Sequence, residues 1–328
     1  MGPAPLQPFN PSTFQPFNPS TLQPFTPRLN HGWTYCDRIR ARHAGVTALD
    51  FYASLYRHSD RATWSRRFDA GEISRNGAPA QPGDTLAEGD MLEWRRPPWE
   101  EGEVPRDFRI VYEDASILAV DKPAGLPVLP DGGFLENTLV HLLSLRYPGE
   151  NPVPAHRLNR GTSGLILFSR TPEARRDLAA QFRDKTARRD GEMRKVYVAR
   201  TVPYPGGRVG DRITIETPIG EVPHPWLGAV HAARPDGKPS CSRCEIIAAE
   251  ADSTLWRIDL VTGRPHQIRI HLASIGAPLL GDPLFLPGGH PRPDALPGDC
   301  GYFLRSVSLT FRHPATGDRM TLSVPPFP

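Results

Sequence analysis

The sequence predicts an α+β protein in which a mixed, mainly antiparallel sheet is flanked by helices and preceded by a smaller α+β domain. Strand-like and helical stretches alternate from residue 107 to residue 328. A compact region at 36–97 lies before them, separated by a charged, proline-bearing linker at 98–106. The length of 328 residues leaves room for one large and one small core.

The elements of the large domain, 107–328, follow from the spacing of apolar residues. A hairpin is predicted at 110–114 and 117–120, and residues 165–168 form an apolar run typical of a buried strand. Helical spacing predicts helices at 138–147 and 173–184. Further strands are predicted at 195–200, 244–248, 255–260, 303–311 and 320–324. These strands complete the sheet.

Residues 1–29 repeat a proline-rich phrase, Gln-Pro-Phe-Asn-Pro-Ser-Thr, that neither a helix nor a strand can accommodate. We interpret them as a disordered tail of low complexity. Two alternatives stay open: a proline-rich ligand for a partner domain, or an upstream start codon included in the chain.

The region 36–97 combines two short helices, at 51–56 and 64–68, with a strand at 71–77 that ends in an Asn-Gly turn. A turn and a strand follow at 89–94. This order, with three arginines nearby, resembles the S4 RNA-binding domain. The resemblance implies that Arg66, Arg67 and Arg75 contact RNA. The alternative is a small α+β appendage with a solvated arginine face.

One loop, residues 156–164, reads His-Arg-Leu-Asn-Arg-Gly-Thr-Ser-Gly. It resembles the signature His-Arg-Leu-Asp-x-x-Thr-Ser-Gly of the RluA family of RNA pseudouridine synthases, and it matches every fixed position except one. At that position the family has its catalytic aspartate, and this chain has Asn159.

Two further blocks carry the same resemblance. Residues 194–197, Arg-Lys-Val-Tyr, resemble the family's Lys-x-Tyr strand. Residues 262–272, Thr-Gly-Arg-Pro-His-Gln-Ile-Arg-Ile-His-Leu, resemble the family's block that carries its arginine, here Arg269. We expect a helix to begin after Thr262 as N-cap, with Ile268, Leu272 and Ile275 on its inner face. Residues 276–282 continue the match.

The resemblance implies isomerisation of uridine to pseudouridine in RNA, with the target base flipped into a pocket. It implies a carboxylate at position 159, an RNA contact at Arg157 that helps to evict the base, stacking by Tyr197, and pairing of Arg269 with residue 159. Further RNA contacts are expected from Arg160, Arg264 and Leu304. No metal and no nucleotide cofactor are expected, because the isomerisation is redox-neutral.

Asn159 leaves the chemistry open, because an amide carries no charge and is a poor nucleophile. Three interpretations stay open. The protein binds RNA without catalysis; or a different acid serves, or the reaction needs no carboxylate at this position; or the chain comes from a subgroup, or from a sequence, in which the written asparagine is misleading. Asp282 is the best candidate for such an acid, but its turn position predicts a structural role. Arg269 is expected to keep a neutral hydrogen bond to residue 159, and its replacement to weaken RNA binding without unfolding.

Composition sets limits on partners and location. Net charge is +3, which permits an RNA partner, and no apolar run approaches the length of a membrane span. We expect a cytoplasmic monomer that acts on ribosomal or transfer RNA. The alternatives are a catalytically impaired RNA-binding protein or ribosome-assembly factor on the same fold, and a hydrolase or glycosidase, which would need two facing acids.

Overall fold

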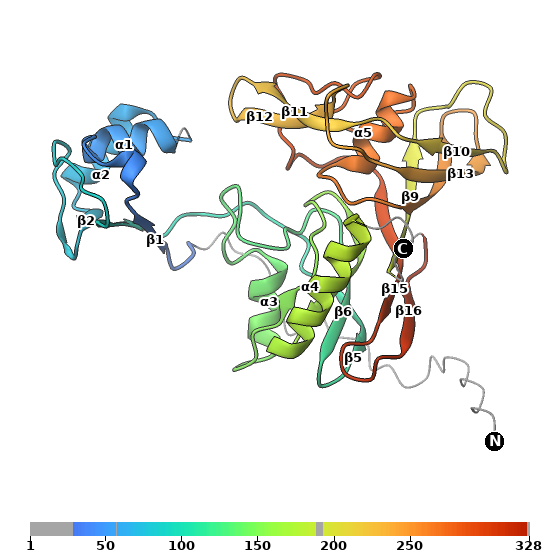
Figure 1. Cartoon of the computed structure of the whole chain (residues 1–328), viewed down its shortest axis with the longest axis horizontal. Helices are drawn as coiled ribbons and strands as arrows, with labels where there is room; N and C mark the ends of the chain where they lie inside the picture. The colour runs from blue at the N-terminus through green and yellow to red at the C-terminus, as the bar shows by residue number, and fades with distance from the viewer. Residues whose placement is uncertain (1–28, 57, 188–192, 327–328) are drawn as a thin grey trace.

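The computed structural model describes residues 29–56, 58–187 and 193–326. Except for Leu29, the predicted proline-rich tail lies outside the described residues. A small domain stands apart from a larger one, and an extended segment joins them (Figure 1). The predicted α+β class is confirmed, since a ten-stranded, mostly antiparallel sheet forms the large domain.

The small domain holds a four-stranded sheet in the order β1-β4-β2-β3, with two helices packed beside it. Its elements are β1 (Trp33–Arg38), α1 (Ala48–Leu55), α2 (Arg61–Asp69), β2 (Ile73–Arg75), β3 (Ala78–Pro79) and β4 (Met91–Arg96). Asn76 and Gly77 both have positive φ, so the predicted hairpin turn is confirmed. The sheet begins at Trp33, before the predicted boundary at 36, because the mostly exposed β1 has no apolar alternation to announce it.

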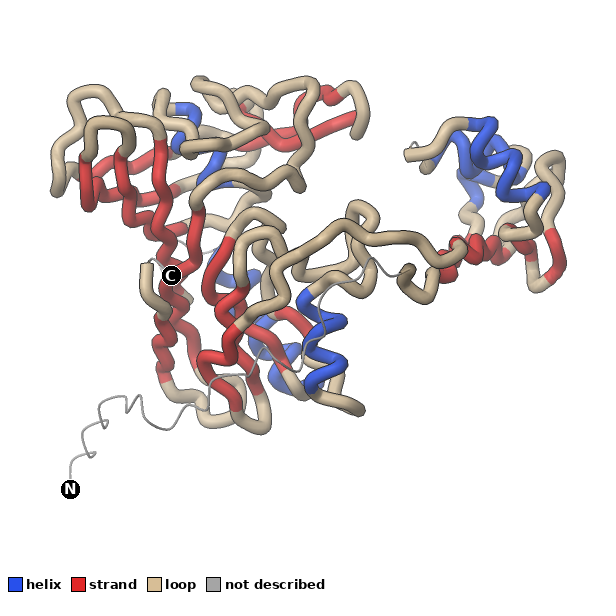
Figure 2. The backbone as a smooth tube through the Cα atoms, turned by 180° about the vertical axis from the view of Figure 1, so that it is seen from behind, coloured by secondary structure: helices blue, strands red, loops and turns tan. Residues whose placement is uncertain are grey.

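The large sheet runs in the order β10-β13-β14-β9-β15-β8-β6-β5, with β16 beside β15 and β7 beside β8. Among the strand pairs of the described residues, β8 and β15 are the one parallel pair. Figure 2 shows this sheet from behind as one continuous band of strands. Its strands are β5 (Arg109–Glu113), β6 (Ile117–Lys122), β7 (Val153–Pro154), β8 (Ser163–Ser169), β9 (Arg194–Thr201), β10 (Arg212–Ile215), β13 (Ser242–Ala249), β14 (Thr254–Leu260), β15 (Leu304–Arg312) and β16 (Arg319–Ser323).

Two of the predicted helices of this domain, observed as α3 (Leu139–Arg146) and α4 (Pro172–Ala187), belong to different cores. Leu118 and Val120 of β6 are buried in one cluster with α3. Ile117 and Ala119 are buried in another cluster with Leu178 of α4. Because successive side chains of a strand point to opposite faces, the helices cover opposite faces of β6.

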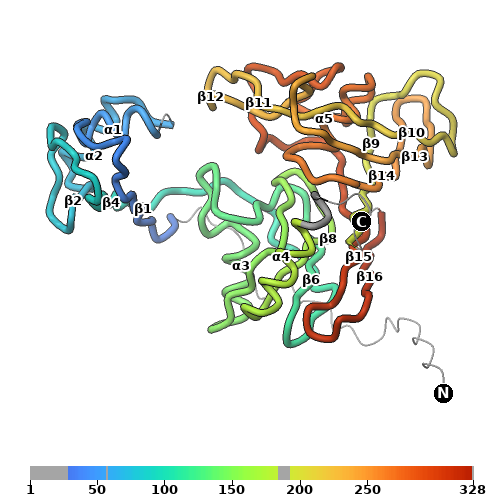
Figure 3. The backbone as a smooth tube through the Cα atoms, in the orientation of Figure 1, coloured from blue at the N-terminus to red at the C-terminus, as the bar shows by residue number. Residues whose placement is uncertain are grey.

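A hairpin of β11 (Ile219–His224) and β12 (Gly228–Ala233) lies over α5 (Gln267–Ser274). Neither this hairpin nor β10 was predicted, because prolines and glycines interrupt residues 202–240. Figure 3 shows β14, β9 and α5 meeting at the upper half of the large domain. Ile268 and Leu272 of α5 are buried there and Ile275 packs against the same cluster, as predicted.

The segment predicted as a linker, 98–106, is tied to the large domain. The Glu101 carboxylate is buried and accepts hydrogen bonds from Asn30 Nδ2 and from the backbone N–H groups of Glu136 and Asn137, at 2.6, 2.9 and 2.8 Å. Trp99 Nε1 donates to the carbonyl of Gly133. No helix among residues 29–56, 58–187 and 193–326 has the length and apolar content that crossing a membrane demands.

The signature loop ends at Gly164, where the backbone needs glycine. Its φ is +99°, and a Cβ added there would lie 2.1 Å from the carbonyl oxygen of Ser306 on β15. This close approach permits the parallel contact between β8 and β15.

We expect Gly164→Ala to lower the free energy of unfolding by roughly 3 kcal/mol, since backbone strain and overpacking add. Gly276→Ala is the matched control: φ is +82° there and no atom lies within 4 Å of the added Cβ. Strain alone should cost it about 1–2 kcal/mol. Urea unfolding of both variants measures the difference, and equal losses would contradict the proposed close approach.

Candidate active site

One cavity of about 1050 Å³ opens in the large domain, between the signature loop, β9 and the start of α5. Its walls bring together residues that lie far apart in the sequence. Seven of the predicted site residues line it: Arg157, Asn159, Arg160, Tyr197, Arg264, Arg269 and Leu304. The three sequence blocks therefore converge in space.

Asn159 faces a histidine. Its Nδ2 lies 3.0 Å from Nδ1 of His266. Burial, with the nearby Arg269 charge, lowers the pKa of His266 to about 3, so the imidazole is neutral near pH 7. A neutral Nδ1 accepts a hydrogen bond from the Asn159 amide. The Asn159 amide is therefore hydrogen-bonded within the protein.

The predicted N-cap of α5 is wrong. His266, with φ of 54°, takes the N-cap position, and Thr262 instead donates its hydroxyl to Gln267 Oε1 at 2.7 Å. Gln267 Oε1 also accepts from the backbone N–H of Arg264. These contacts form a tight turn that places the His266 ring beside residue 159.

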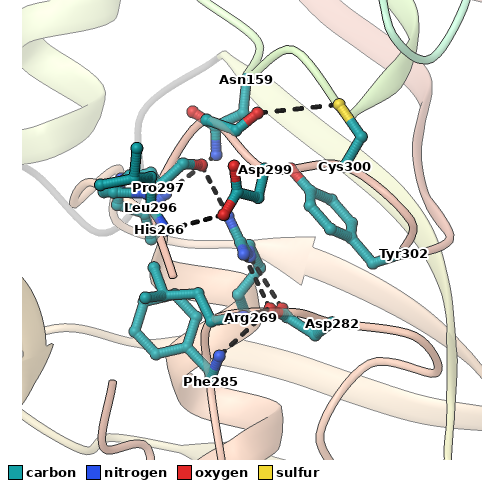
Figure 4. A network of polar contacts seen from close by, with 12 residues as sticks. Asn159, His266, Arg269, Asp282, Phe285, Leu296, Pro297, Asp299, Cys300 and Tyr302 are labelled. Atoms are coloured by element: carbon teal, nitrogen blue, oxygen red, sulfur yellow. Dashed lines mark hydrogen bonds and ion pairs between the residues drawn. The ribbon is translucent and has the colours of Figure 1, made fainter. Parts of the chain in front are cut away.

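The predicted pairing of Arg269 with residue 159 is also wrong. Arg269 forms a bidentate ion pair with Asp282, at 2.8 Å from Nε to Oδ2 and 2.7 Å from Nη2 to Oδ1. Both side chains are only 1% exposed. Arg269 Nη1 donates to the carbonyl of Pro297 at 3.1 Å, and its guanidinium lies 4.3 Å from the Tyr302 ring centroid. Figure 4 shows this network. The structural role predicted for Asp282 is confirmed.

Tyr197 gives the cavity an aromatic wall. The side chain lies on β9 and is 6% exposed. Burial raises the pKa of its phenol to about 12, so the ring stays neutral at physiological pH. Lys195, two residues earlier on the same face, also lines the cavity, and burial lowers its pKa to about 8.

Arginines surround the opening. Arg160 Nε donates to the carbonyl of Gly298 at 3.0 Å, and its guanidinium lies 5.1 Å from the Phe134 ring centroid. Arg264 Nε donates to the carbonyl of Pro239 at 3.3 Å, whereas Arg157 is exposed. These cations can meet phosphates at the cavity entrance.

The three arginines of the small domain that were predicted to contact RNA do not line the cavity, and each has a partner within the domain. The Arg67 guanidinium lies 4.2 Å from the ring centroids of both Trp64 and Trp94. Arg75 pairs with Asp90 at 2.6 Å. Arg66 is exposed and bonds Thr63.

The sequence interpretation missed several cavity residues, above all His266 and Asp299. His266 lies inside a motif that had been recognised, but its left-handed backbone gave no signal. Asp299 lies in the proline- and glycine-rich segment 286–301, where no periodicity draws attention to it.

Comparison with known proteins agrees with the resemblance found in the sequence motifs. Residues 116–274 match the model of a family described as RNA pseudouridylate synthase. An uncharacterized RNA pseudouridine synthase of Synechocystis sp. is 42% identical over 279 residues, covering 84% of this chain and 93% of that protein. RNA pseudouridine synthase 5 of Oryza sativa subsp. japonica is 34% identical, covering 90% and 87%.

A ribosomal large subunit pseudouridine synthase D of Pseudomonas aeruginosa is 33% identical, covering 83% of this chain and 86% of that protein. Among solved structures, human RNA pseudouridylate synthase domain containing 1 is 22% identical with a TM-score of 0.50, covering 69% of this chain and 86% of that chain. This last similarity supports the fold.

We expect Asp282→Asn to lower the free energy of unfolding by about 3–5 kcal/mol, because it leaves the buried Arg269 without its counter-charge. Arg269→Ala should also be destabilising, because it leaves the buried Asp282 carboxylate unpaired; the sequence had predicted a variant that folds normally. Asp294→Asn, at an exposed position, is the control and should change stability by less than about 0.5 kcal/mol. Urea unfolding at pH 7 gives both values.

We expect Asn159→Asp to raise the pKa of His266 well above its value of about 3, because a carboxylate at Nδ1 favours the imidazolium. In the wild type, the unfolded imidazole titrates near 6.5. Between about pH 6.5 and pH 3 the unfolded state takes up a proton at His266 and the folded state does not. The free energy of unfolding therefore falls by up to about 1.4 kcal/mol for each pH unit over this range. Titration of the ring by NMR measures both proteins, and an unchanged pKa would contradict the contact.

Proposed function

The chain belongs to the RluA-type family of RNA pseudouridine synthases, and we propose that it isomerises uridine to pseudouridine in structured RNA. The observation that carries the proposal is the convergence of three motif blocks, centred on Asn159, Tyr197 and Arg269, on one cavity. Its volume of about 1050 Å³ can accommodate a flipped nucleotide.

The cavity offers what an extruded uridine needs. Flipping costs a few kcal/mol, and stacking on an aromatic ring returns ~1–3 kcal/mol. Tyr197 provides that ring in its neutral form. Arg157, Arg160 and Arg264 supply positive charge for the flanking phosphates. No cofactor or metal enters this proposal, because uridine and pseudouridine are isomers and their interconversion is redox-neutral overall.

The small domain is proposed to bind RNA as an S4-like domain. Two helices followed by a hairpin with the Asn76-Gly77 turn support the likeness. Arg66 is the arginine best placed for a phosphate, because it is exposed, whereas Arg67 and Arg75 have stacking and ionic partners inside the domain.

The substrates proposed are ribosomal RNA and transfer RNA. Relatives named ribosomal large subunit pseudouridine synthase D make ribosomal RNA the first to test. We further propose that the protein is cytoplasmic and works as a monomer.

A second candidate function is RNA binding without turnover. It rests on Asn159 alone, because the amide there cannot act as nucleophile or base and already bonds His266. An assay for turnover separates the two candidates.

Tritium release tests the proposed activity, because the C5–H bond of uridine is replaced by the new C5–C1′ bond. We expect the wild type to release tritium from [5-³H]uridine-labelled ribosomal or transfer RNA of a strain lacking the gene. Tyr197→Ala should slow release about 10-fold or more through lost stacking. Val209→Ala, exposed and outside the cavity, is the control and should match the wild type.

Tight RNA binding without any tritium release from either RNA pool would contradict the proposed isomerase and favour the second candidate. Mass spectrometry of the digested RNA identifies the modified uridine when release is seen.

A further inference from the structure

We propose that Asp299 supplies the carboxylate that acts on the ribose of the target uridine in this chain. This inference rests on the proposed function. It starts from the observation that the chemistry requires a carboxylate beside the sugar while position 159 carries an amide.

Neither Asn159 nor Asp282 can fill this role. The Asn159 amide is uncharged and bonds His266 Nδ1 at 3.0 Å. Asp282 is 1% exposed, and both its oxygens bond Arg269, while Oδ1 also accepts the backbone N–H groups of Leu284 and Phe285. A substrate cannot reach a carboxylate that is so enclosed.

Among the described residues that line the cavity, the acids are Asp131 and Asp299. Asp131 is exposed on a short turn that it closes with Phe134. Asp299 is partly buried, and Figure 4 shows it beside the network of Asn159, His266 and Arg269. Asp299 is therefore the cavity acid that lies on the side of residue 159 (Figure 4).

A built turn holds Asp299 in place. The backbone N–H of Asp299 donates to the Leu296 carbonyl at 3.0 Å, and the Leu296 N–H donates to Asp299 Oδ2 at 2.8 Å. Oδ2 is thereby fixed. Within the described part of the chain, Oδ1 of Asp299 has no hydrogen-bond partner, so it is available to a ligand.

Two arginines of the cavity anchor that turn from either side. Arg269 Nη1 donates to the Pro297 carbonyl and Arg160 Nε to the Gly298 carbonyl, at 3.1 and 3.0 Å. Arg269, which was expected to hold the side chain at 159, thus holds the backbone that carries Asp299. Arg269 therefore still positions an acid, but that acid is Asp299 and not residue 159.

The step balances without a co-reactant. Asp299 Oδ1 bonds to C1′ as the C1′–N1 bond breaks, and the electron pair of that bond leaves with the uracil. After the uracil turns, its C5 attacks C1′, and the carboxylate leaves with the electron pair of the C1′–O bond. This departure regenerates the carboxylate. C5 then loses its proton to water and N1 takes one up, which completes pseudouridine.

The test measures tritium release by Asp299→Asn on [5-³H]uridine-labelled ribosomal and transfer RNA from a strain lacking the gene. The amide oxygen can still accept from the Leu296 N–H, so the turn should persist. We expect turnover to fall roughly 100-fold or more, with RNA affinity within about threefold of the wild type by filter binding. Asp294→Asn, the same change at an exposed position of the same segment, should match the wild type.

Each outcome decides the matter. If the wild type turns over and Asp299→Asn does so within about threefold of it, the inference is overturned and the proposed function stands. If the wild type releases no tritium from either RNA pool, the proposed function fails and the inference fails with it. Should Asp299→Asn melt at a lower temperature than the wild type, Asp299→Ser, whose hydroxyl can also accept from the Leu296 N–H, gives the decisive rate.

Discussion

The buried ion pair between Arg269 and Asp282 is the interaction on which the cavity depends. Removing two charges from water is costly, and this cost is offset only when geometry is good and the remaining N–H groups are bonded. Both conditions hold: the pair is bidentate, and Nη1 reaches the Pro297 carbonyl. The pair joins the first turn of α5, the turn after Asp282 and the 296–299 turn, so three parts of the cavity wall share one anchor.

This anchor explains why the chain can carry an amide at position 159 without losing the site. Arg269 is satisfied by Asp282, so replacing a carboxylate at 159 leaves no guanidinium unpaired. The amide is satisfied by His266, whose lowered pKa keeps Nδ1 free to accept a hydrogen bond. The contacts that stabilise the fold around residue 159 therefore do not require a carboxylate there. An amide at 159 leaves the position of Asp299 unchanged.

The sequence predicted which residues line the cavity better than it predicted which of them contact one another. Motif spacing brought residues 157, 159, 197 and 269 to one cavity, and apolar alternation located the strands that position them. The sequence could not reveal the ion-pair partner of Arg269, because that partner is whichever acid the tertiary structure places next to the guanidinium. His266 escaped notice because its left-handed backbone depends on Gln267 bonding Thr262 and the Arg264 N–H. Asp299 sits in a segment without periodicity.

The linker adds a further constraint, because it is bonded to a rim of the cavity. Glu101 accepts from Asn30 on one side and from the backbone of residues 136 and 137 on the other. The loop before those residues carries Phe134, which stacks under Arg160, and Arg160 in turn bonds Gly298. A continuous set of contacts thus runs from the edge of the small domain to the turn of Asp299. The linker and the residues just before β1 therefore help to fix the position of this rim, so the geometry of the cavity depends on contacts made outside the large domain.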